Sequence, residues 1–408
     1  MSFAETPDEE LWLATKSDHP EERAEALQEL GTRAFHEANW PLAKTLFGSA
    51  ADLFQELDNQ NEVTKCIYSV GFAHYRLGEH EEAISMLTRA LESAQELVDS
   101  RTIAFSAAPL ADCYSYQGDD TKAIEFYELA IEAFDEIEDP ANAGFNAISL
   151  GELHGKASRQ TQALQCFIRS YNNFQSIGDA YGAARAKDRM AAALIELGDL
   201  DQAIQHIEDA LNTFAHLAEE ERVAFMRYRL GWTLVLHQKY ARAIPELRTA
   251  AAYFRSTKDW SMAAAVELQL AIALADIDPD SRSEESEQLL TRLNAFFESV
   301  GEITNALIVQ SLYGERLFDS GSYEAAATLF GDIIERAIEI DDPYIVRATR
   351  AAQAEALFKA GRITDAKNVL AEIDASEWGE NKKQLERLER VKKLMLDTMA
   401  LTLNIDVG

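Results

Sequence analysis

A small residue recurs along the chain at a fixed stride of 40 positions. The series comprises Gly31, Gly71, Ala111, Gly151, Ala191, Gly231 and Ala271, followed by Gly314 and Ala354 after a slip of three residues. A fixed period of this length is typical of stacked helix pairs, in which each pair contacts only its neighbours along the chain. The pattern therefore predicts an all-α solenoid of about nine helix hairpins.

The residues that follow each small position indicate why it is small. In the second repeat, Ala83 lies twelve residues after Gly71 and the large apolar Leu87 lies four residues later. A glycine inside a helix costs about 1 kcal/mol relative to alanine, so we expect close contact between the small residue and the large residue of the paired helix. Five glycines that suit the left-handed end of a helix separate the two helices of a repeat: Gly78, Gly118, Gly198, Gly321 and Gly361.

The joins between repeats carry residues that cap helices. An Asp or Asn side chain satisfies free amides at the start of a helix, and Pro140 and Pro343 follow two of these residues at a position where a helix tolerates proline. The set is Asn59, Asp99, Asp139, Asp179, Asp259 and Asp342, with Glu219 and Glu302 at the remaining joins.

These repeated positions resemble the tetratricopeptide repeat in a 40-residue form, over about residues 22 to 375. The resemblance implies a right-handed α-solenoid superhelix, in which the first helix of each pair lines a concave groove and the second faces outward. Arrays with similarly long repeats occur in Rap-like bacterial peptide sensors and in kinesin light chains.

Three segments depart from the period. Residues 1–21 are polar and form a short lead-in. The three inserted residues near 276–286 predict a lengthened loop with a turn at Asp278, Pro279 and Asp280, or alternatively a kink or subdomain boundary. Residues 376–408 predict a C-terminal capping helix and tail, because a terminal repeat needs a helix with a polar outer face to cover it. The alternative is a basic helix that docks a second chain or an acidic partner.

Bulk composition and the missing motifs limit the function. The chain has 70 acidic and 38 basic residues, and its net charge of -32 disfavours nucleic acid and anionic membranes as partners. We find no signal peptide, no membrane span, no catalytic motif and no metal-ligand spacing among its cysteines. We therefore expect a cytoplasmic, non-catalytic protein without metal or cofactor. The sequence gives no indication of its oligomeric state.

The resemblance also implies which residues line the groove: those six and three before the small residue, and one, four and five after it. In repeats two to six these positions and their borders carry rings and cations, which peptide-binding interfaces concentrate. Because cations outnumber acids among them, we expect an acidic or carboxylate-bearing ligand. The competing interpretation is that the rings pack between neighbouring first helices. The predicted partner-binding residues are Lys65, Tyr68, Tyr75, Arg76, Lys156, Arg185, Arg189, Tyr228, Arg229 and Trp232.

The sequence therefore predicts an interaction scaffold that binds a peptide or a partner segment in its groove. The alternative is a Rap-like sensor of signal peptides, which acts when the superhelix tightens around its ligand. Relatives of that kind carry an N-terminal effector segment, whereas about 21 residues precede the array here.

Overall fold

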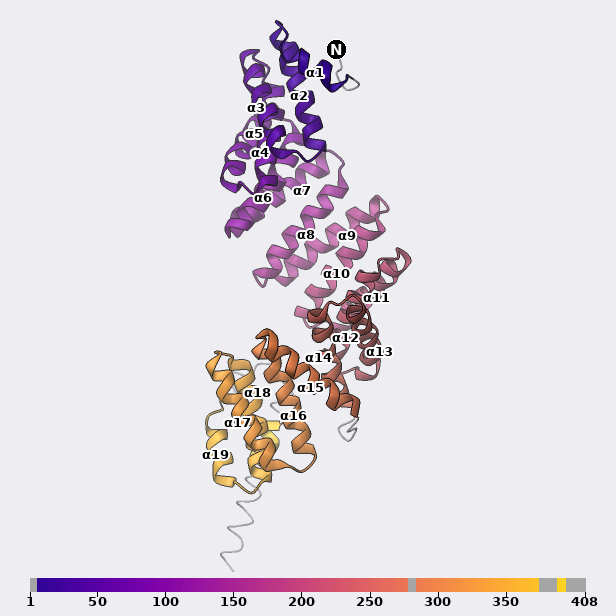
Figure 1. Ribbon diagram of the computed structural model, residues 1–408, viewed down its shortest axis with the longest axis vertical. Helices are drawn as coiled ribbons and strands as arrows, with labels where there is room; N and C mark the ends of the chain where they lie inside the picture. Colours follow the sequence, from indigo (N-terminus) through magenta and orange to yellow (C-terminus); the bar gives the residue numbers. More distant parts are fainter. Residues whose placement is uncertain (1–5, 278–283, 374–386, 394–408) are drawn as a thin grey trace, which may run out of the picture. The chain divides into compact units, whose positions relative to one another are not determined.

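The computed structural model describes residues 6–277, 284–373 and 387–393 (Figure 1). Every regular element in these ranges is a helix. A short helix, α1 (Asp8–Ala14), precedes the repeats. The first helices of repeats one to nine are α2 (Pro20–His36), α4 (Gln60–Leu77), α6 (Ser100–Gln117), α8 (Pro140–Lys156), α10 (Ala180–Glu196), α12 (Glu220–Leu236), α14 (Trp260–Ile277), α16 (Ile303–Asp319) and α18 (Pro343–Lys359). The second helices are α3 (Trp40–Glu56), α5 (His80–Leu97), α7 (Asp120–Glu136), α9 (Gln160–Ser176), α11 (Leu200–His216), α13 (Tyr240–Ser256), α15 (Glu284–Val300), α17 (Tyr323–Glu339) and α19 (Ile363–Ala371).

The predicted all-α solenoid of helix hairpins is confirmed. Its contacts form two compact units, an N-terminal unit of Met1–Glu220 and a C-terminal unit of Glu221–Gly408. The insertion near 276–286 lies inside the C-terminal unit, and the turn predicted at Asp278, Pro279 and Asp280 lies outside the described residues. The right-handed superhelix stays a prediction.

The predicted contact between small and large residues is present in repeats from both units. A Cβ added to Gly71 would lie 2.8 Å from Leu87, and one added to Gly151 would lie 2.5 Å from Phe167. A Cβ added to Gly314 in the eighth repeat would come still closer to the ring of Phe330. These separations are too short for a side chain, so each glycine lets the two helices of its hairpin approach closely.

The predicted helix ends are also present. Gly78, like the other four glycines predicted to end first helices, has a positive φ. The side chain of Asp139 accepts a hydrogen bond from the amide of Asn142 at 3.1 Å, and the other predicted Asp and Asn caps make the equivalent bond. Glu302 makes no such bond. Its longer side chain instead accepts a hydrogen bond from the Asn305 amide group at 3.3 Å.

The lead-in is held against the first repeat. Leu11 of α1 is fully buried in the same apolar cluster as Leu30 and Phe47. Asp8 forms an ion pair with Arg33 of α2 at 2.5 Å. The helix α1 therefore covers apolar surface of repeat one, as a capping helix does in a solenoid.

In three of the described repeats, an ion pair not foreseen from the sequence joins the two parts of the hairpin at the same pair of positions. One partner of each pair lies on the first helix, four residues before the small residue. The other lies two residues after the large residue of the second helix. In the seventh repeat the order of the charges is inverted, and its glutamate is 3% exposed. The pairs are Lys187–Asp209 at 2.8 Å, Glu267–Arg292 at 2.6 Å and Arg350–Glu372 at 3.0 Å.

The cysteines are free thiols. Cys66 and Cys113 are buried and Cys166 is half-buried. Burial raises the pKa of Cys66 to about 12, and those of Cys113 and Cys166 to about 11. At neutral pH these thiols stay protonated, so they fill space as apolar residues.

Within the described ranges, no helix is both long and apolar enough to cross a membrane. Across the same residues, no three His, Cys, Asp or Glu side chains gather in a way that would hold a metal ion.

Two glycine substitutions test the hairpin contact. We expect Gly151→Ala to lower the free energy of unfolding by about 1–3 kcal/mol, because the added methyl group overlaps the ring of Phe167. Gly48, inside α3, has no atom within 4 Å of an added Cβ, so Gly48→Ala should raise stability by about 0.5–1 kcal/mol. Chemical denaturation of both variants gives the comparison. Equal stabilisation by the two substitutions would contradict the packing argument.

Candidate partner-binding surface

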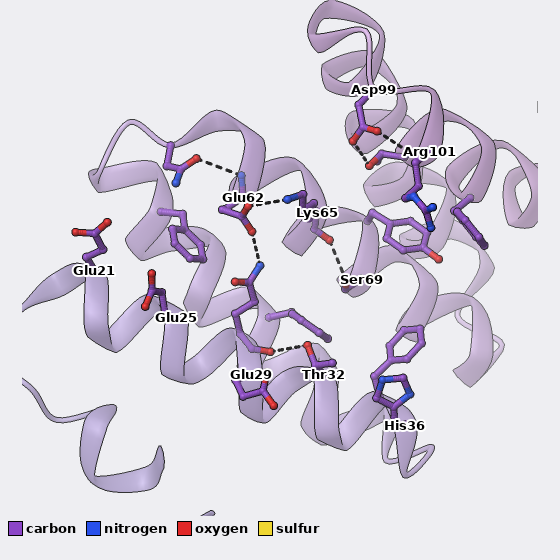
Figure 2. Close-up of a pocket in the computed structure, with 18 residues that line it drawn as sticks. Glu21, Glu25, Glu29, Thr32, His36, Glu62, Lys65, Ser69, Asp99 and Arg101 are labelled. Carbon is purple, nitrogen blue, oxygen red and sulfur yellow. Dashed lines mark hydrogen bonds and ion pairs between the residues drawn. The ribbon is translucent and has the colours of Figure 1, made fainter. Parts of the chain in front are cut away.

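A cavity of about 840 Å³ lies between the first helices of repeats one to three, α2, α4 and α6 (Figure 2). Its lining includes all five groove positions of repeat one, counted from the small residue Gly31. The groove residues predicted from the sequence start at repeat two, but the same offsets counted from Gly31 give these residues. They are Glu25, Gln28, Thr32, Phe35 and His36.

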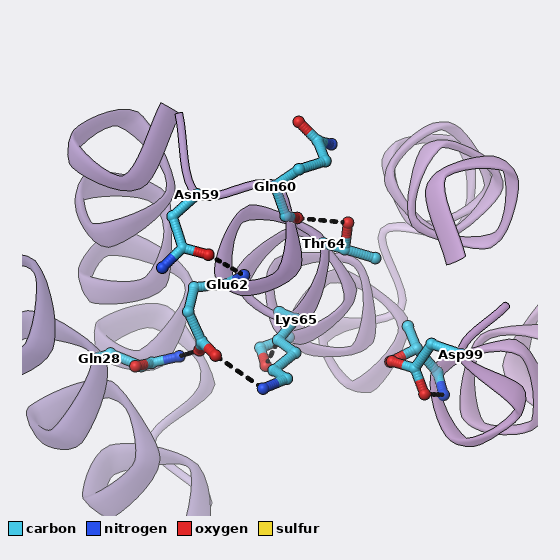
Figure 3. Close-up of polar contacts among 9 residues, drawn as sticks. Gln28, Asn59, Gln60, Glu62, Thr64, Lys65 and Asp99 are labelled. Atoms are coloured by element: carbon cyan, nitrogen blue, oxygen red, sulfur yellow. Dashed lines mark hydrogen bonds and ion pairs between the residues drawn. The ribbon is translucent and has the colours of Figure 1, made fainter. Parts of the chain in front are cut away.

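Two of the predicted binding residues, Lys65 and Tyr68 of α4, line this cavity. Lys65 contacts Glu62 with 2.7 Å between Nζ and Oε1. Gln28 of α2 donates a hydrogen bond to the other oxygen of Glu62 at 2.6 Å, and Asn59 caps the helix at the Glu62 amide (Figure 3). Burial by itself would raise the pKa of Glu62, but the hydrogen bonds from Gln28 and Lys65 bring the pKa below its usual value. Glu62 therefore stays charged and offsets Lys65.

The rings of repeats one to three form one packed group. Phe72 of α4 lies 5.1 Å from Phe35 and 6.1 Å from Tyr68, measured between ring centroids. Tyr68 is half-buried and also lies 6.4 Å from Phe105 of α6. Burial raises the pKa of Tyr68 above its usual value. Tyr68 therefore both lines the cavity and packs against the neighbouring first helices.

Arg76 lies outside the cavity lining, near the C-terminal end of α4. Its guanidinium carbon is 4.6 Å from the centroid of the Trp40 ring and 5.9 Å from that of Phe72. The side chain is exposed, so this cation lies over rings that belong to two repeats.

The hydroxyl of Tyr75 forms a hydrogen bond within the protein. Its hydroxyl donates to Asp112 of α6 at 2.7 Å, and the hydroxyl of Tyr127 of α7 donates to the other carboxylate oxygen. Burial, with the adjacent Asp112 charge, raises the pKa of both tyrosines above their usual value. The network joins repeats two and three, and the sequence analysis missed the pairing because the three residues are far apart in the chain.

Repeats four and five present predicted cations on α8 and α10. Lys156 is exposed at the end of α8. The Arg185 guanidinium carbon lies 5.7 Å from the ring of Phe145, which is 43% exposed. Arg189 pairs with Glu152 at 2.9 Å. This surface therefore combines an accessible ring with cations that solvent reaches.

The last three predicted residues belong to the C-terminal unit and form a separate group on α12. Tyr228 packs on Phe225 at 6.2 Å with an edge-to-face geometry, and the Arg229 guanidinium carbon lies 5.5 Å from the same ring. Trp232 is half-buried. Burial raises the pKa of Tyr228 above its usual value.

Carboxylates outnumber cations in the lining of the cavity. Its lining, drawn entirely from the described residues, holds the cations Lys65 and Arg101 and the imidazole of His36, and Glu62 already offsets Lys65. The carboxylates that line it are Glu21, Glu25, Glu29, Glu62 and Asp99.

The tetratricopeptide repeat family model matches residues 63–136. No curated protein sequence matches the chain. Among solved structures, the apo form of RapI has a TM-score of 0.54 at 14% sequence identity, and the match covers 88% of this chain and 99% of RapI. The STAND signal-transduction ATPase PH0952 from Pyrococcus horikoshii, which has a tetratricopeptide repeat sensor, has a TM-score of 0.54 at 15% identity over 74% of this chain and 48% of its own. At these identities the likeness shows the fold alone.

The network around Asp112 leads to a pH-dependent prediction. The pKa of Tyr127 is raised in the folded state, while an unfolded tyrosine titrates near about pH 10. The stability that Tyr127 contributes is therefore fully present below about pH 10 and is lost as the pH rises above it. We expect Tyr127→Phe to reduce the fall in unfolding free energy between about pH 9 and 11.

Tyr116→Phe is the matched control, because Tyr116 is 76% exposed. Unfolding in urea, repeated across this pH range, gives the comparison. An unchanged alkaline fall in the Tyr127 variant would show that the network does not couple to stability.

Proposed function

We propose that this tetratricopeptide-like repeat protein binds a peptide or a helical segment of a partner protein on the face formed by its first helices, and that it catalyses no reaction. The observation that carries the proposal is the cavity of about 840 Å³ between α2, α4 and α6, whose lining includes every groove position of repeat one. A concave site with a few converging polar groups is the usual form of a binding site.

The neighbouring repeats extend this face with the kinds of side chain that protein interfaces favour. Phe145 and Tyr116 are exposed rings, and Arg185 lies against Phe145. Rings and arginines contribute most of the binding energy at such interfaces. The cations Lys156, Arg185 and Arg189 support our proposal of an acidic or carboxylate-bearing ligand at repeats four and five.

The net charge of -32 supports a partner that is neither nucleic acid nor an anionic membrane. A cytoplasmic location fits three free thiols.

A charge reversal on the face of repeats four and five tests the function. We expect Lys156→Glu, Arg185→Glu and Arg189→Glu together to abolish capture of proteins that the unaltered protein retains from a lysate of its host. The reason is that three cations which meet the partner become repulsive. Quantitative mass spectrometry of the retained proteins provides the measurement.

The matched control reverses three exposed cations on second helices, Arg89, Lys122 and Arg169. It changes the net charge by the same amount, and it also breaks ion pairs, of Lys122 with Asp119 and of Arg169 with Asp135. If both triple variants retained the same proteins as the unaltered chain, the binding face would be wrongly assigned.

A further inference from the structure

Three carboxylates of the cavity lie along one edge of α2. Glu21, Glu25 and Glu29 follow one another at intervals of four residues, so they share one side of the helix (Figure 2). Glu29 pairs with Arg33 at 3.1 Å. The side chains of Glu21 and Glu25 have no hydrogen bond or ion pair with any residue that the structure describes. Two carboxylates at the cavity therefore lack a cation.

Apolar surface lies beside these charges. Phe35, Tyr68 and Phe105 line the same cavity, and each is half-buried. Such rings accept a guanidinium group on their faces and pack against the methylene groups of arginine or lysine. A carboxylate edge next to a ring wall thus suits a long cationic side chain better than an anion.

In the C-terminal unit, carboxylates and a ring hold an arginine side chain of the same protein. Residues 387–393 are helical, and Val391 is buried in an apolar cluster with Phe330 and Ile345. Arg387 is 8% exposed and lies between two first helices. It contacts Glu315 of α16 and Glu355 of α18 at 2.5 and 2.6 Å.

Two details make this contact informative for the cavity. Glu315 and Glu355 each directly follow the small residue of their helix, which is a groove position. The Arg387 guanidinium carbon also lies 5.4 Å from the centroid of the Phe318 ring. First helices of this chain therefore hold a basic helical turn with two carboxylates and a ring, which are the components that line the cavity.

We propose that the cavity between α2, α4 and α6 binds a basic segment of a partner protein, with an arginine or lysine side chain between the carboxylates of α2 and the ring wall. The inference rests on the proposed function and names the chemistry of the ligand at repeats one to three. Lys65 and Arg101 do not oppose it, since Glu62 offsets Lys65 and the carboxylates still outnumber the cations. The cavity volume of about 840 Å³ accommodates several side chains.

Selection from a displayed library of random peptides of about twelve residues, on the whole 408-residue chain, tests the proposal. We expect the selected peptides to be enriched in arginine and lysine next to apolar residues. Their affinity should fall at least about tenfold in a Glu21→Lys, Glu25→Lys variant and should weaken with added salt. Glu92→Lys, Glu96→Lys is the matched control, because both glutamates are exposed on the second helix α5 and neither lines the cavity.

The possible results separate the two proposals. Peptides that are acidic, or that bind the Glu21 and Glu25 variant as well as the unaltered protein, would overturn the basic ligand and leave peptide binding in place. No enrichment of any peptide on the folded protein would overturn both. A Glu21→Gln, Glu25→Gln variant, with its helical content checked by circular dichroism, separates loss of charge from loss of folding. This glutamine variant should also bind the selected peptides more weakly than the unaltered protein does, but by a smaller factor than the lysine variant.

Discussion

The close contact between a small residue on the first helix and a large residue on the second is the constraint on which the array depends. At Gly151 the Phe167 ring occupies the space that a side chain would need. This contact fixes the distance between the two helices and the rotation of the first helix about its axis. A residue at a given offset from the small position therefore has a set orientation relative to the second helix of its own hairpin. The cavity between α2, α4 and α6 is a product of that orientation.

The sequence was sufficient for the hairpins because their determinants are local or periodic. A capping residue such as Asp139 bonds an amide three residues away, and Gly78 needs only its own backbone conformation. Contacts between repeats were harder to foresee. Tyr75 bonds Asp112, which is 37 residues away, and a repeat pattern does not say whether a ring at a groove position is free or engaged.

The predicted charge of the groove depended on which repeats were counted. The cations of repeats two to five were assigned correctly to first helices, but Lys65 and Arg189 each have a carboxylate partner. The acidic edge of α2 was left out of the count. Side-chain pairing of this kind depends on rotamers and neighbouring helices, which the 40-residue stride does not specify. Carboxylates therefore outnumber cations in the cavity of repeats one to three, whereas the cations of α8 and α10 lie beside Glu152 and Asp188.

In the seventh repeat the two charges of the ion pair are exchanged, which bears on how the repeats of such a chain can change in sequence. Lys187 with Asp209, and Glu267 with Arg292, put opposite signs at the same two positions, yet both pairs close across their own hairpin. Glu267 also pairs with Arg255 of α13, however, so the inverted repeat is matched by a cation on the copy that precedes it. A hairpin whose charges are exchanged can therefore be moved along the array only together with the neighbour that supplies the second cation, while the contact between small and large residues keeps the copies in register.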